Sequence, residues 1–400
     1  MKLLKTLFNP INLYKCQKNY KNKLKELKNK KPIRVIFLVR ENQKWQYQTL
    51  YQLLEEDKNF EPLVLVSLLY LVHKGKDKTR NNLEENYNFF KERNINVDYA
   101  YKNGEYINLK EFNPDIVFYD QPWDLPKIHN IPEVSNHALT CYAPYGCEIL
   151  DCKSDYTQDF HKLLFKFFVG NNDCLERYES YKKHNSNNCI VTGYPKLDAY
   201  FEPVRQKNIW KDENKFKIIY APHHSFDKKG LHLATFNQNG KFILELAKKY
   251  PRTSWIFKPH PRFKYALLKN NIMNEQEIEN YYGEWANVGK VYEQGDYFDI
   301  FKTSDLMITD CCSFLGEYFP TKKPLIHLVG LHHSNNKLGE QIEKALYLAN
   351  TNDELLTLFK DIICSENDTK RTQREKFVNE TFCYKGGEKI YKNIIGGIYD

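Results

Sequence analysis

Residues 297–329 contain the pattern that restricts the fold most strongly. An apolar run at 306–308 is followed by the polar turn 309–313, a helical pattern and a second apolar run at 325–329. A strand, a turn, a helix and a strand in this order predict a βαβ unit with parallel strands. The polar turn would then lie at the carboxyl end of a strand and the amino end of a helix. Free N–H groups and the helix dipole at such a place favour an anion, usually phosphate.

The same alternation of strands and helices fills the rest of the chain. Four hundred residues are too many for one ordinary α/β domain and fit two. Because the charged stretch 203–215 interrupts the alternation, we expect a linker there. The sequence therefore predicts an α/β fold with four parts: a basic amphipathic arm at 1–31, an N-terminal Rossmann-like domain at 32–205, a C-terminal Rossmann-like domain at 215–365, and C-terminal helices at 366–400.

The composition argues against several classes of protein. With 42% apolar residues, each domain can bury a core. No apolar run approaches the roughly 20 residues that span a bilayer, and no signal-peptide pattern is visible. The ten cysteines form no CxxC pair and no zinc-like spacing, so we expect reduced cysteines in a cytoplasmic protein. The adjacent Cys311 and Cys312 are more typical of small buried apolar residues than of a redox pair.

The net charge of +8 is concentrated in residues 1–31, which hold ten lysines and one glutamate. Leu4, Leu7 and Ile11 lie among these lysines, a mixture typical of a segment on an anionic membrane surface. The alternative is a solvated basic helix. No nucleic-acid-binding motif accompanies the charge, so we expect no nucleic acid partner. We therefore expect a protein held peripherally at the inner face of the cell membrane.

Three polar motifs follow predicted strands in the second half: APHHS at 221–225, KPHPR at 258–262 and TDCCS at 309–313. Because ligands of open α/β sheets bind at the carboxyl ends of strands, the three motifs should line one rim. Cations, imidazoles and hydroxyl groups on one rim indicate a nucleoside diphosphate. The candidate donor-binding residues are His223, Ser225, Lys258, Arg262, Asp310, Cys312 and Ser313, with His260 among them as a candidate catalytic residue.

Other nucleotide-binding patterns are missing. There is no P-loop and no GxGxxG fingerprint. There is also no DxD pair, so Lys258, Arg262 and the helix dipole would neutralise the pyrophosphate without a metal. Each motif also has a structural interpretation, because Lys-Pro-His-Pro can be a stiff loop and Asp310 a helix cap. The histidine doublets at 223–224 and 332–333 suggest a metal, but no carboxylate pattern accompanies them.

At these positions the sequence resembles a known family. The string SDLMITDCCS at 304–313, followed by EY at 317–318 and KPLI at 323–326, is similar to a signature of the CDP-glycerol glycerophosphotransferases of teichoic-acid and capsule synthesis. The segments YAP at 220–222 and KPHP at 258–261 look like two further motifs of that family, in the same order. The resemblance implies a GT-B fold, in which two Rossmann-like domains face a cleft. The C-terminal domain would hold a CDP-activated donor and the N-terminal domain the acceptor.

The resemblance also implies roles for particular residues. His260 matches the family histidine near the donor pyrophosphate, where an imidazolium could stabilise charge on the departing CMP. Asp310 and Ser313 match the turn that helps to hold the donor phosphates.

The N-terminal half departs from the family pattern. The family usually carries a catalytic-base histidine in a WHG motif there, whereas this chain has YAPYG at 142–146. The base is therefore unassigned. The nearby candidates are His137, Asp120 and Tyr145, with Tyr145 and Gly146 on the acceptor side, although a tyrosine would be a poor base at neutral pH.

These observations predict a transferase of cell-surface polysaccharide synthesis, of the capsule or teichoic-acid kind. It would move a glycerol-phosphate or other polyol-phosphate group from a CDP-activated donor to a hydroxyl of a glycan or lipid-linked acceptor, with release of CMP and without a cofactor or metal. One alternative is a GT-B glycosyltransferase with a nucleotide-sugar donor, which the missing histidine favours. Another is a non-catalytic GT-B subunit that binds a nucleotide. The sequence leaves the nucleotide base, the transferred group, the acceptor and the oligomeric state open.

Overall fold

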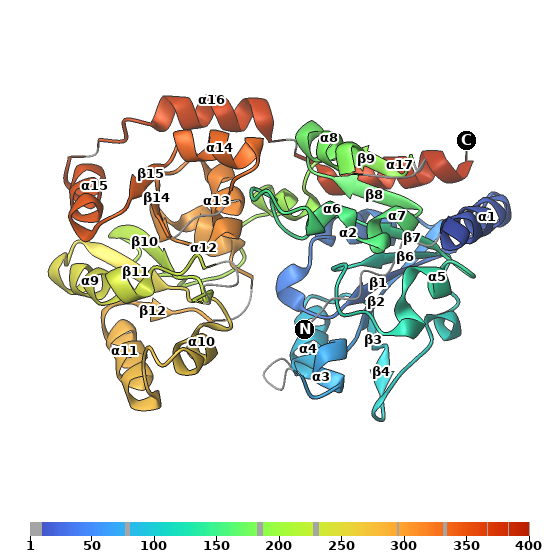
Figure 1. The fold of residues 1–400 in the computed structure, drawn as a ribbon, viewed down its shortest axis with the longest axis horizontal. Helices are drawn as coiled ribbons and strands as arrows, with labels where there is room; N and C mark the ends of the chain where they lie inside the picture. Colours follow the sequence, from blue (N-terminus) through green and yellow to red (C-terminus); the bar gives the residue numbers. More distant parts are fainter. Residues whose placement is uncertain are drawn as a thin grey trace. The chain divides into compact units, whose positions relative to one another are not determined.

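The computed structural model describes residues 10–76, 81–181, 187–226, 232–293, 296–330, 334–365, 367–382 and 384–399. The chain forms two compact units. Each unit has its own sheet of parallel strands (Figure 1), which confirms the predicted α/β fold of two Rossmann-like domains. Unit 1 consists of Met1–Gly146, Cys152–Ala199 and Cys383–Asp400, and unit 2 of Cys147–Asp151 and Tyr200–Phe382.

The sheet of unit 1 has seven strands in the order β3-β2-β1-β6-β7-β8-β9. Its central strands are buried on both faces, which explains why they appear in the sequence as continuous apolar runs. A two-stranded hairpin, β4 and β5, follows β3. The strands are β1 (Ile33–Val39), β2 (Phe60–Val66), β3 (Val97–Tyr99), β4 (Tyr101–Lys102), β5 (Glu105–Tyr106), β6 (Ile116–Tyr119), β7 (Leu139–Tyr142), β8 (Lys166–Val169) and β9 (Cys189–Val191).

Helices and short 3-10 turns connect the strands of unit 1. They are α1 (Pro10–Leu27), η1 (Asn42–Lys44), α2 (Gln48–Glu56), α3 (Tyr70–His73), α4 (Leu83–Lys91), η2 (Leu109–Phe112), η3 (Lys127–His129), α5 (Ile131–Val134), α6 (Ser154–Thr157), α7 (Asp159–Leu163), α8 (Asn172–Tyr181) and α17 (Gly386–Tyr399), and η4 (Pro195–Tyr200) ends at the start of unit 2.

The sheet of unit 2 has six strands in the order β12-β11-β10-β13-β14-β15. Its strands are β10 (Phe216–Ala221), β11 (Thr253–Phe257), β12 (Lys290–Val291), β13 (Leu306–Thr309), β14 (Leu325–Leu328) and β15 (Tyr347–Ala349). Its helices are α9 (Phe236–Lys249), α10 (Phe263–Lys269), α11 (Glu275–Val288), α12 (Phe298–Thr303), α13 (Cys312–Tyr318), η5 (Phe319–Thr321), α14 (Lys337–Lys344), α15 (Asn352–Cys364) and α16 (Arg371–Thr381).

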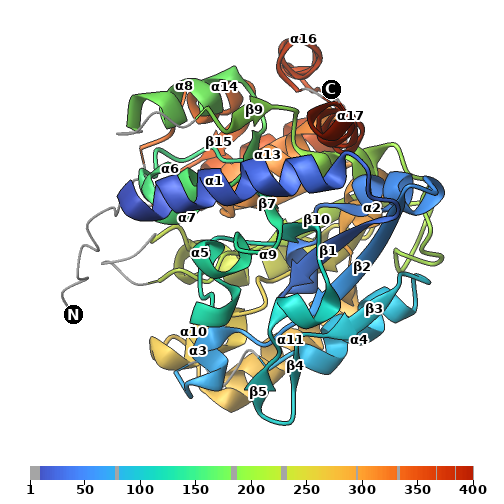
Figure 2. The same cartoon turned by 90° about the vertical axis from the view of Figure 1, so that its right-hand side faces the viewer.

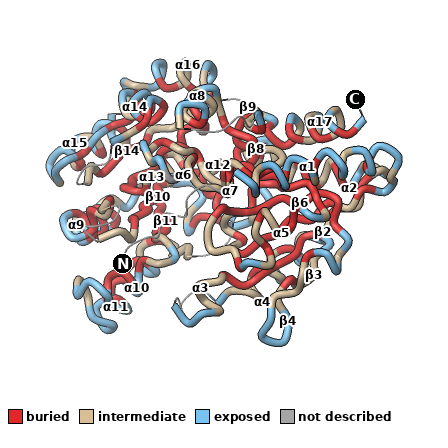
Figure 3. The backbone as a smooth tube through the Cα atoms, turned by 45° about the vertical axis from the view of Figure 1, so that its right-hand side comes forward, coloured by how far each residue is buried: buried red, intermediate tan, exposed pale blue. Residues whose placement is uncertain are grey.

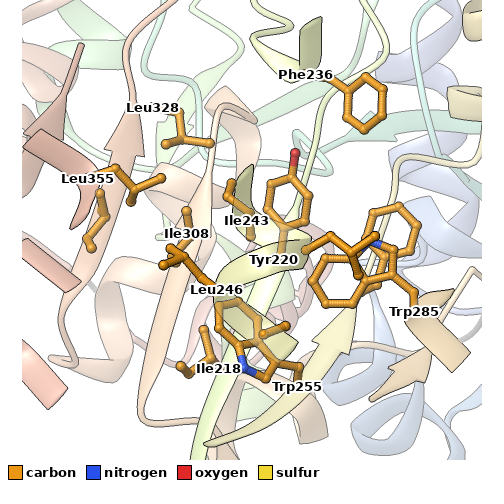
Figure 4. Packing of buried hydrophobic residues seen from close by; sticks show 14 of the residues in the cluster. Ile218, Tyr220, Phe236, Ile243, Leu246, Trp255, Trp285, Ile308, Leu328 and Leu355 are labelled. Carbon is orange, nitrogen blue, oxygen red and sulfur yellow. The ribbon is translucent and has the colours of Figure 1, made fainter. Parts of the chain in front are cut away.

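Aromatic side chains fill the core of unit 2. Trp255 and Trp285 are fully buried, and the rings of Phe257 and Trp285 stack with centroids 5.1 Å apart. Figure 4 shows Trp285 of α11 beside Tyr220 of β10, and Trp255 of β11 beside Ile218 of β10. Strands of both sheets are largely buried, whereas the outer faces of many helices are exposed (Figure 3). This packing fixes the strand ends from which the polar loops project.

The described part of the N-terminal arm is helix α1, which packs against α5 and α7 of unit 1 (Figure 2). Cys16, Tyr20 and Leu27 are buried on one side of this helix. The Tyr20 hydroxyl lies 2.6 Å from Thr140 Oγ1, and Lys23 Nζ lies 2.7 Å from the buried carboxylate of Asp115. Helix α1 is therefore part of the domain, and only its outer face is available to a partner.

The two units differ from the four expected parts at three places. The short segment Cys147–Asp151 lies in unit 2, although the sequence suggests the N-terminal domain. Of the expected C-terminal helices, α16 lies in unit 2 and α17 returns to unit 1. There, Asp198 accepts hydrogen bonds from the backbone N–H groups of Gly386 and Gly387, at 2.9 and 2.7 Å. In the described ranges no helix has the length and apolar character to cross a membrane, and the cysteines are free.

Candidate functional site

The three polar motifs of the second half meet at one rim of unit 2, as predicted. Strand β10 lies between β11 and β13, with Tyr220 opposite Phe257 and Ala221 opposite Thr309. All three strands run in the same direction, so the loops that follow them begin side by side. His260 N donates a hydrogen bond of 3.2 Å to the carbonyl of Pro222, which ties two of these loops together.

Asp310 joins two of these loops and does not present its carboxylate to a ligand. The residue is 1% exposed. Its Oδ1 accepts a hydrogen bond of 2.6 Å from the backbone N–H of His223, and its Oδ2 accepts from the backbone N–H and the hydroxyl of Thr235, at 2.7 and 2.9 Å. Burial raises the pKa of Asp310 to about 6. The expected role in donor binding thus becomes a positioning role, and Cys311, not Asp310, occupies the N-cap of α13.

Hydrogen bonds to His223 fix which of its ring nitrogens carries the proton. Leu233 N donates to Ser225 Oγ at 3.0 Å, so the hydroxyl of Ser225 is free to donate to His223 Nδ1, 2.7 Å away. Ser225 N also donates to His223 Nδ1, at 3.3 Å. With Nδ1 as an acceptor, neutral His223 carries its proton on Nε2. Ser225 therefore orients His223 in this structure.

His260 has the same arrangement. Its Nδ1 accepts a hydrogen bond of 3.1 Å from the backbone N–H of Arg262, so Nε2 carries the proton. Burial lowers the pKa of His260 well below its ordinary value, and the neighbouring His224, His223, Lys258 and Arg262 lower it further. At neutral pH the side chain is therefore a neutral N–H donor, and not the imidazolium that the resemblance implied.

Three imidazoles gather here. The rings of His224 and His260 stack with centroids 3.9 Å apart, and His223 lies 4.5 Å from His224. Among the described residues, these three form the group that could hold a metal ion, with ligand atoms within 4.8 Å of one another. Histidines that bind a metal usually donate their second ring N–H to an acceptor, whereas Nδ1 of His223 and of His260 accepts from backbone N–H groups. Their Nε2–H groups suit an anion better than a cation.

Two cationic side chains border the imidazoles. Lys258 is 5% exposed, and its Nζ lies 5.0 Å from the ring centre of Tyr297 and 5.5 Å from that of Phe314. Such positions over aromatic faces stabilise an ammonium group. Arg262 is half-buried at the N-cap of α10. Both residues lie on the expected rim, and both add positive potential to it.

A cavity of about 200 Å³ opens beside the N-terminus of α13. Cys312 lines it, whereas Ser313, the next residue of the helix, is exposed. The other lining residues include His327 and Glu343, which sequence analysis missed; His327 Nδ1 lies 3.6 Å from Glu343 Oε1. Burial nevertheless lowers the pKa of His327 to about 4, so this imidazole is neutral at pH 7. The one sequence signal for this cavity was His327 itself, a histidine inside the apolar run of β14.

In unit 1 the structure argues against Asp120 as the base. Asp120 follows β6 at the carboxyl edge of the sheet, but both it and Arg40 are 0% exposed. Arg40 Nε and Nη2 donate to Asp120 Oδ1 at 3.0 and 2.6 Å, and the backbone N–H of Arg40 donates to Oδ2 at 2.7 Å. A carboxylate enclosed in this way cannot reach an acceptor hydroxyl.

His137 lies at the other edge of the sheet. It precedes β7, and parallel strands place everything before them at their amino edge. Its neighbour Asn136 accepts a hydrogen bond of 3.1 Å from Asn19 of α1. Burial lowers the pKa of His137. The structure therefore does not bring His137 to the predicted site.

Tyr145 and Gly146 follow β7 and lie at the carboxyl edge, as expected for the acceptor side. Lys44 Nζ lies 5.0 Å from the ring centre of Tyr145 and contacts Glu41 and Gln121. Sequence analysis missed these three polar residues. Their position directly after β1 and β6 was a signal that could have found them.

Two domains, each with a parallel α/β sheet, give this chain a fold of the GT-B kind. The family model for CDP-Glycerol:Poly(glycerophosphate) glycerophosphotransferase matches residues 159–396, which is more than half of the chain. The protein belongs to this family, and is thus a transferase of the glycerophosphotransferase type. A comparison with curated proteins finds no match.

Solved structures share the fold at low sequence identity. A variant of the wall teichoic acid polymerase TagF is 14% identical with a TM-score of 0.57, over 98% of this chain and 99% of that chain. MnaA from S. aureus, solved with UDP, is 16% identical with a TM-score of 0.58, over 90% and 96% of the two chains. The UDP-GlcNAc 2-epimerase from Neisseria meningitidis, bound to UDP-GlcNAc, is 15% identical with a TM-score of 0.58, over 91% and 100%.

Proposed function

We propose that this protein transfers a glycerol-phosphate or other polyol-phosphate group from a CDP-activated donor to a hydroxyl of a glycan or lipid-linked acceptor. The acceptor oxygen attacks the β-phosphorus of the donor, the bond between that phosphorus and the oxygen of CMP breaks, and CMP leaves. The family to which the chain belongs supports this reaction. The product would be a phosphodiester of a cell-surface polymer, such as a capsule or a teichoic acid.

The observation that carries the proposal is the pair of N–H donors on the rim of unit 2. His223 and His260 each present a protonated Nε2, because their Nδ1 atoms accept backbone hydrogen bonds. Donors fixed before the ligand arrives stabilise charge on phosphate oxygens without reorganisation. Lys258 and Arg262 add the positive potential that a diphosphate requires, so the proposal needs no metal.

The cavity beside α13 is the proposed place of the donor nucleoside. It opens next to Cys312, close to the diphosphate rim, and its volume of about 200 Å³ suits a flat base. Neutral His327 and the carboxylate of Glu343 offer a hydrogen-bond donor and an acceptor for a base or a ribose. These groups give a means to select among nucleotides.

A thermal-shift screen with CDP, CMP, UDP, GDP and ADP tests the donor, because a ligand that binds only the native state raises Tm. Selective stabilisation by CDP or CMP supports the proposal. The variant Val329→Phe, which narrows the cavity, should weaken that shift. Val204→Phe is the matched control, since Val204 is 46% exposed in the same unit. Equal stabilisation by all five nucleotides would contradict the proposed CDP donor.

A glycosyltransferase with a nucleotide-sugar donor is the second candidate. The segment 142–146 lacks the histidine that the family usually carries, and this departure favours the alternative. Analysis of the reaction product separates the two. A phosphodiester link supports the first function, and a glycosidic link supports the second.

We also propose that the outer face of α1 contacts an anionic membrane surface. Four lysines of this helix are exposed, and Ile11 and Tyr14 beside them are 60% and 68% exposed. Positive charge with a few apolar side chains suits the interface of an anionic bilayer. The buried face of α1 belongs to unit 1, so binding would require no unfolding. The exposed lysines are Lys15, Lys18, Lys21 and Lys25.

A further inference from the structure

A short segment, Cys147–Asp151, packs within unit 2, although the elements on both sides of it in the sequence, β7 and α6, belong to unit 1. We call residues 147–151 the crossing segment. Its Ile149 and Leu150 line the cavity beside α13. This wall of the cavity therefore comes from the N-terminal half of the sequence, and the polar motifs of the second half gave no signal for it.

Hydrogen bonds fix the crossing segment to the loop that precedes α14. Leu150 pairs with Asn335 in an antiparallel bridge. The backbone N–H of Asn336 donates to the carbonyl of Ile149 at 2.9 Å, and its side-chain Nδ2 donates to the carbonyl of Glu148 at 2.6 Å. The same side chain caps α14 through its Oδ1. Asn336, which is 7% exposed, thus holds the crossing segment and the start of α14 together.

Two glycines let the crossing segment approach the helices closely. A Cβ atom on Gly316 of α13 would lie 2.6 Å from Cβ of Cys147, and a Cβ atom on Gly339 of α14 would lie 2.3 Å from the carbonyl oxygen of Ile149. Distances this short exclude any larger residue unless the segment shifts. The wall of the cavity is therefore closely packed as well as hydrogen-bonded.

We infer that the crossing segment determines which nucleobase the donor cavity accepts, and that Asn336 is the positioning residue that holds it. A purine has two fused rings and a pyrimidine has one, so a wall that cannot move outward admits the pyrimidine and excludes the purine. The side chains of Ile149 and Leu150 set this limit, because they form the wall. The inference rests on the proposed function, since it needs the donor nucleoside in this cavity.

Leu150→Ala tests the size limit, because it shortens one side chain of the wall and keeps the backbone contacts. Titration calorimetry with CDP and ADP gives the preference of each protein as the ratio of the two Kd values. The wild type should prefer CDP, and Leu150→Ala should lower this preference about tenfold or more. Leu348→Ala is the matched control, since Leu348 is 40% exposed on β15 of the same unit, and it should keep the wild-type preference.

Asn336→Asp tests the positioning role. Aspartate can still cap α14, but it has no N–H group to donate to the carbonyl of Glu148. The donor KM should rise about tenfold with kcat nearly unchanged, because the change removes binding and not catalysis. Asn274→Asp is the matched control: Asn274 caps α11 of the same unit, with its Oδ1 accepting from Glu277 N at 2.9 Å. Its KM should equal that of the wild type.

The outcomes separate this inference from the proposed function. If the wild type prefers CDP, and Leu150→Ala and Asn336→Asp keep its preference and its donor KM, the inference is overturned and the proposed function stands. A lower Tm of Asn336→Asp with an unchanged KM would mean that Asn336 only stabilises the fold, which overturns its positioning role. A wild type that binds no nucleotide, or binds CDP and ADP equally, contradicts the proposed function itself.

Discussion

His260 Nδ1 accepts a hydrogen bond of 3.1 Å from the backbone N–H of Arg262, which sits two residues later in the same loop. This contact decides that Nε2 of His260 carries the proton. Because burial and the surrounding imidazoles and cations lower the pKa of His260 well below its ordinary value, the group stays neutral at neutral pH. In the proposed reaction the side chain would therefore act on a donor phosphate as a fixed N–H dipole, and this form leads to a specific prediction.

His260→Gln should keep part of the transfer activity, whereas His260→Ala should lose about 100-fold or more in kcat. Glutamine can place an N–H group near the position of Nε2 and alanine cannot. Steady-state kinetics on both variants, with Tm as the check on folding, measures the difference. If alanine and glutamine behave alike and turn over at the wild-type rate, His260 is not part of the site.

Asp310→Ala should lower the free energy of unfolding by about 3 kcal/mol or more. The carboxylate accepts three hydrogen bonds in a fully buried place, from His223 N, Thr235 N and Thr235 Oγ1, and alanine leaves these donors without an acceptor. Asp310→Asn is the milder control, because the amide oxygen of asparagine can still accept at least one of these hydrogen bonds. Urea unfolding of the three proteins provides the comparison. Equal stability of wild type and Asp310→Ala would show that the loops do not depend on this carboxylate.

His161 should make the protein less stable in acid. Burial lowers the pKa of this 1% exposed imidazole from 6.5 to about 3. Between these values the unfolded chain binds a proton that the native chain does not, so stability is present above pH 6.5 and is lost as the pH falls towards 3, by about 1.4 kcal/mol per pH unit. The ring packs against Phe167, with centroids 4.9 Å apart, so phenylalanine should fit.

Unfolding of wild type and His161→Phe, measured at several values between pH 7 and 4.5, checks this dependence. The difference in unfolding free energy between the two proteins should change steadily below pH 6.5 in favour of the variant. A difference that stays constant across the range would mean that His161 is protonated equally in the folded and unfolded chains.

Replacement of Lys15, Lys18, Lys21 and Lys25 by glutamate should weaken co-sedimentation with anionic vesicles at least tenfold, since each lysine near such a surface contributes about 1 kcal/mol. Tm should hardly change, because these side chains are exposed. Deletion of the whole arm is a poorer test, because it removes the buried Tyr20 and Leu27. Lys23→Ala is the contrasting variant: it breaks the contact with Asp115 and should lower Tm while vesicle binding persists. If the glutamate variant sediments with the vesicles as well as the wild type does, the outer face of α1 is an ordinary solvated surface.

Local patterns determined the fold class. Alternating apolar runs and helical patterns predict parallel strands such as β10, β11 and β13, and the polar motifs after them fall on one rim because parallel strands end at the same edge. The helical pattern of residues 263–286 looks continuous in the sequence, but the structure divides it into α10 and α11, with Asn274 in a capping box at the start of the second. The adjacent Asn270 and Asn271 lie at this break, and hydrophobic periodicity alone overlooks such a signal.

The resemblance of the motifs at 220–222, 258–261 and 304–326 correctly indicated the family, which the match over 159–396 shows. The resemblance implied that Asp310 helps to hold the donor phosphates. In the structure this carboxylate is buried and accepts hydrogen bonds from the backbone of His223 and Thr235. The doublet at 332–333 lies outside the described residues, so its role stays a prediction. The membrane contact, the acceptor and the absence of a cofactor are likewise expectations that need experiment.

The sequence by itself determined which residue types follow each strand and therefore which chemistry gathers at each rim. Only the tertiary structure decided what each of those groups does. Asp310 meets the backbone of His223 across 87 residues of chain, and Asp120 meets Arg40 across 80. Such partners fix burial, protonation and orientation, and no local pattern encodes them. A carboxylate at a strand end looks the same in the sequence whether it faces a substrate or a buried arginine, because the difference lies in which distant strand packs beside it.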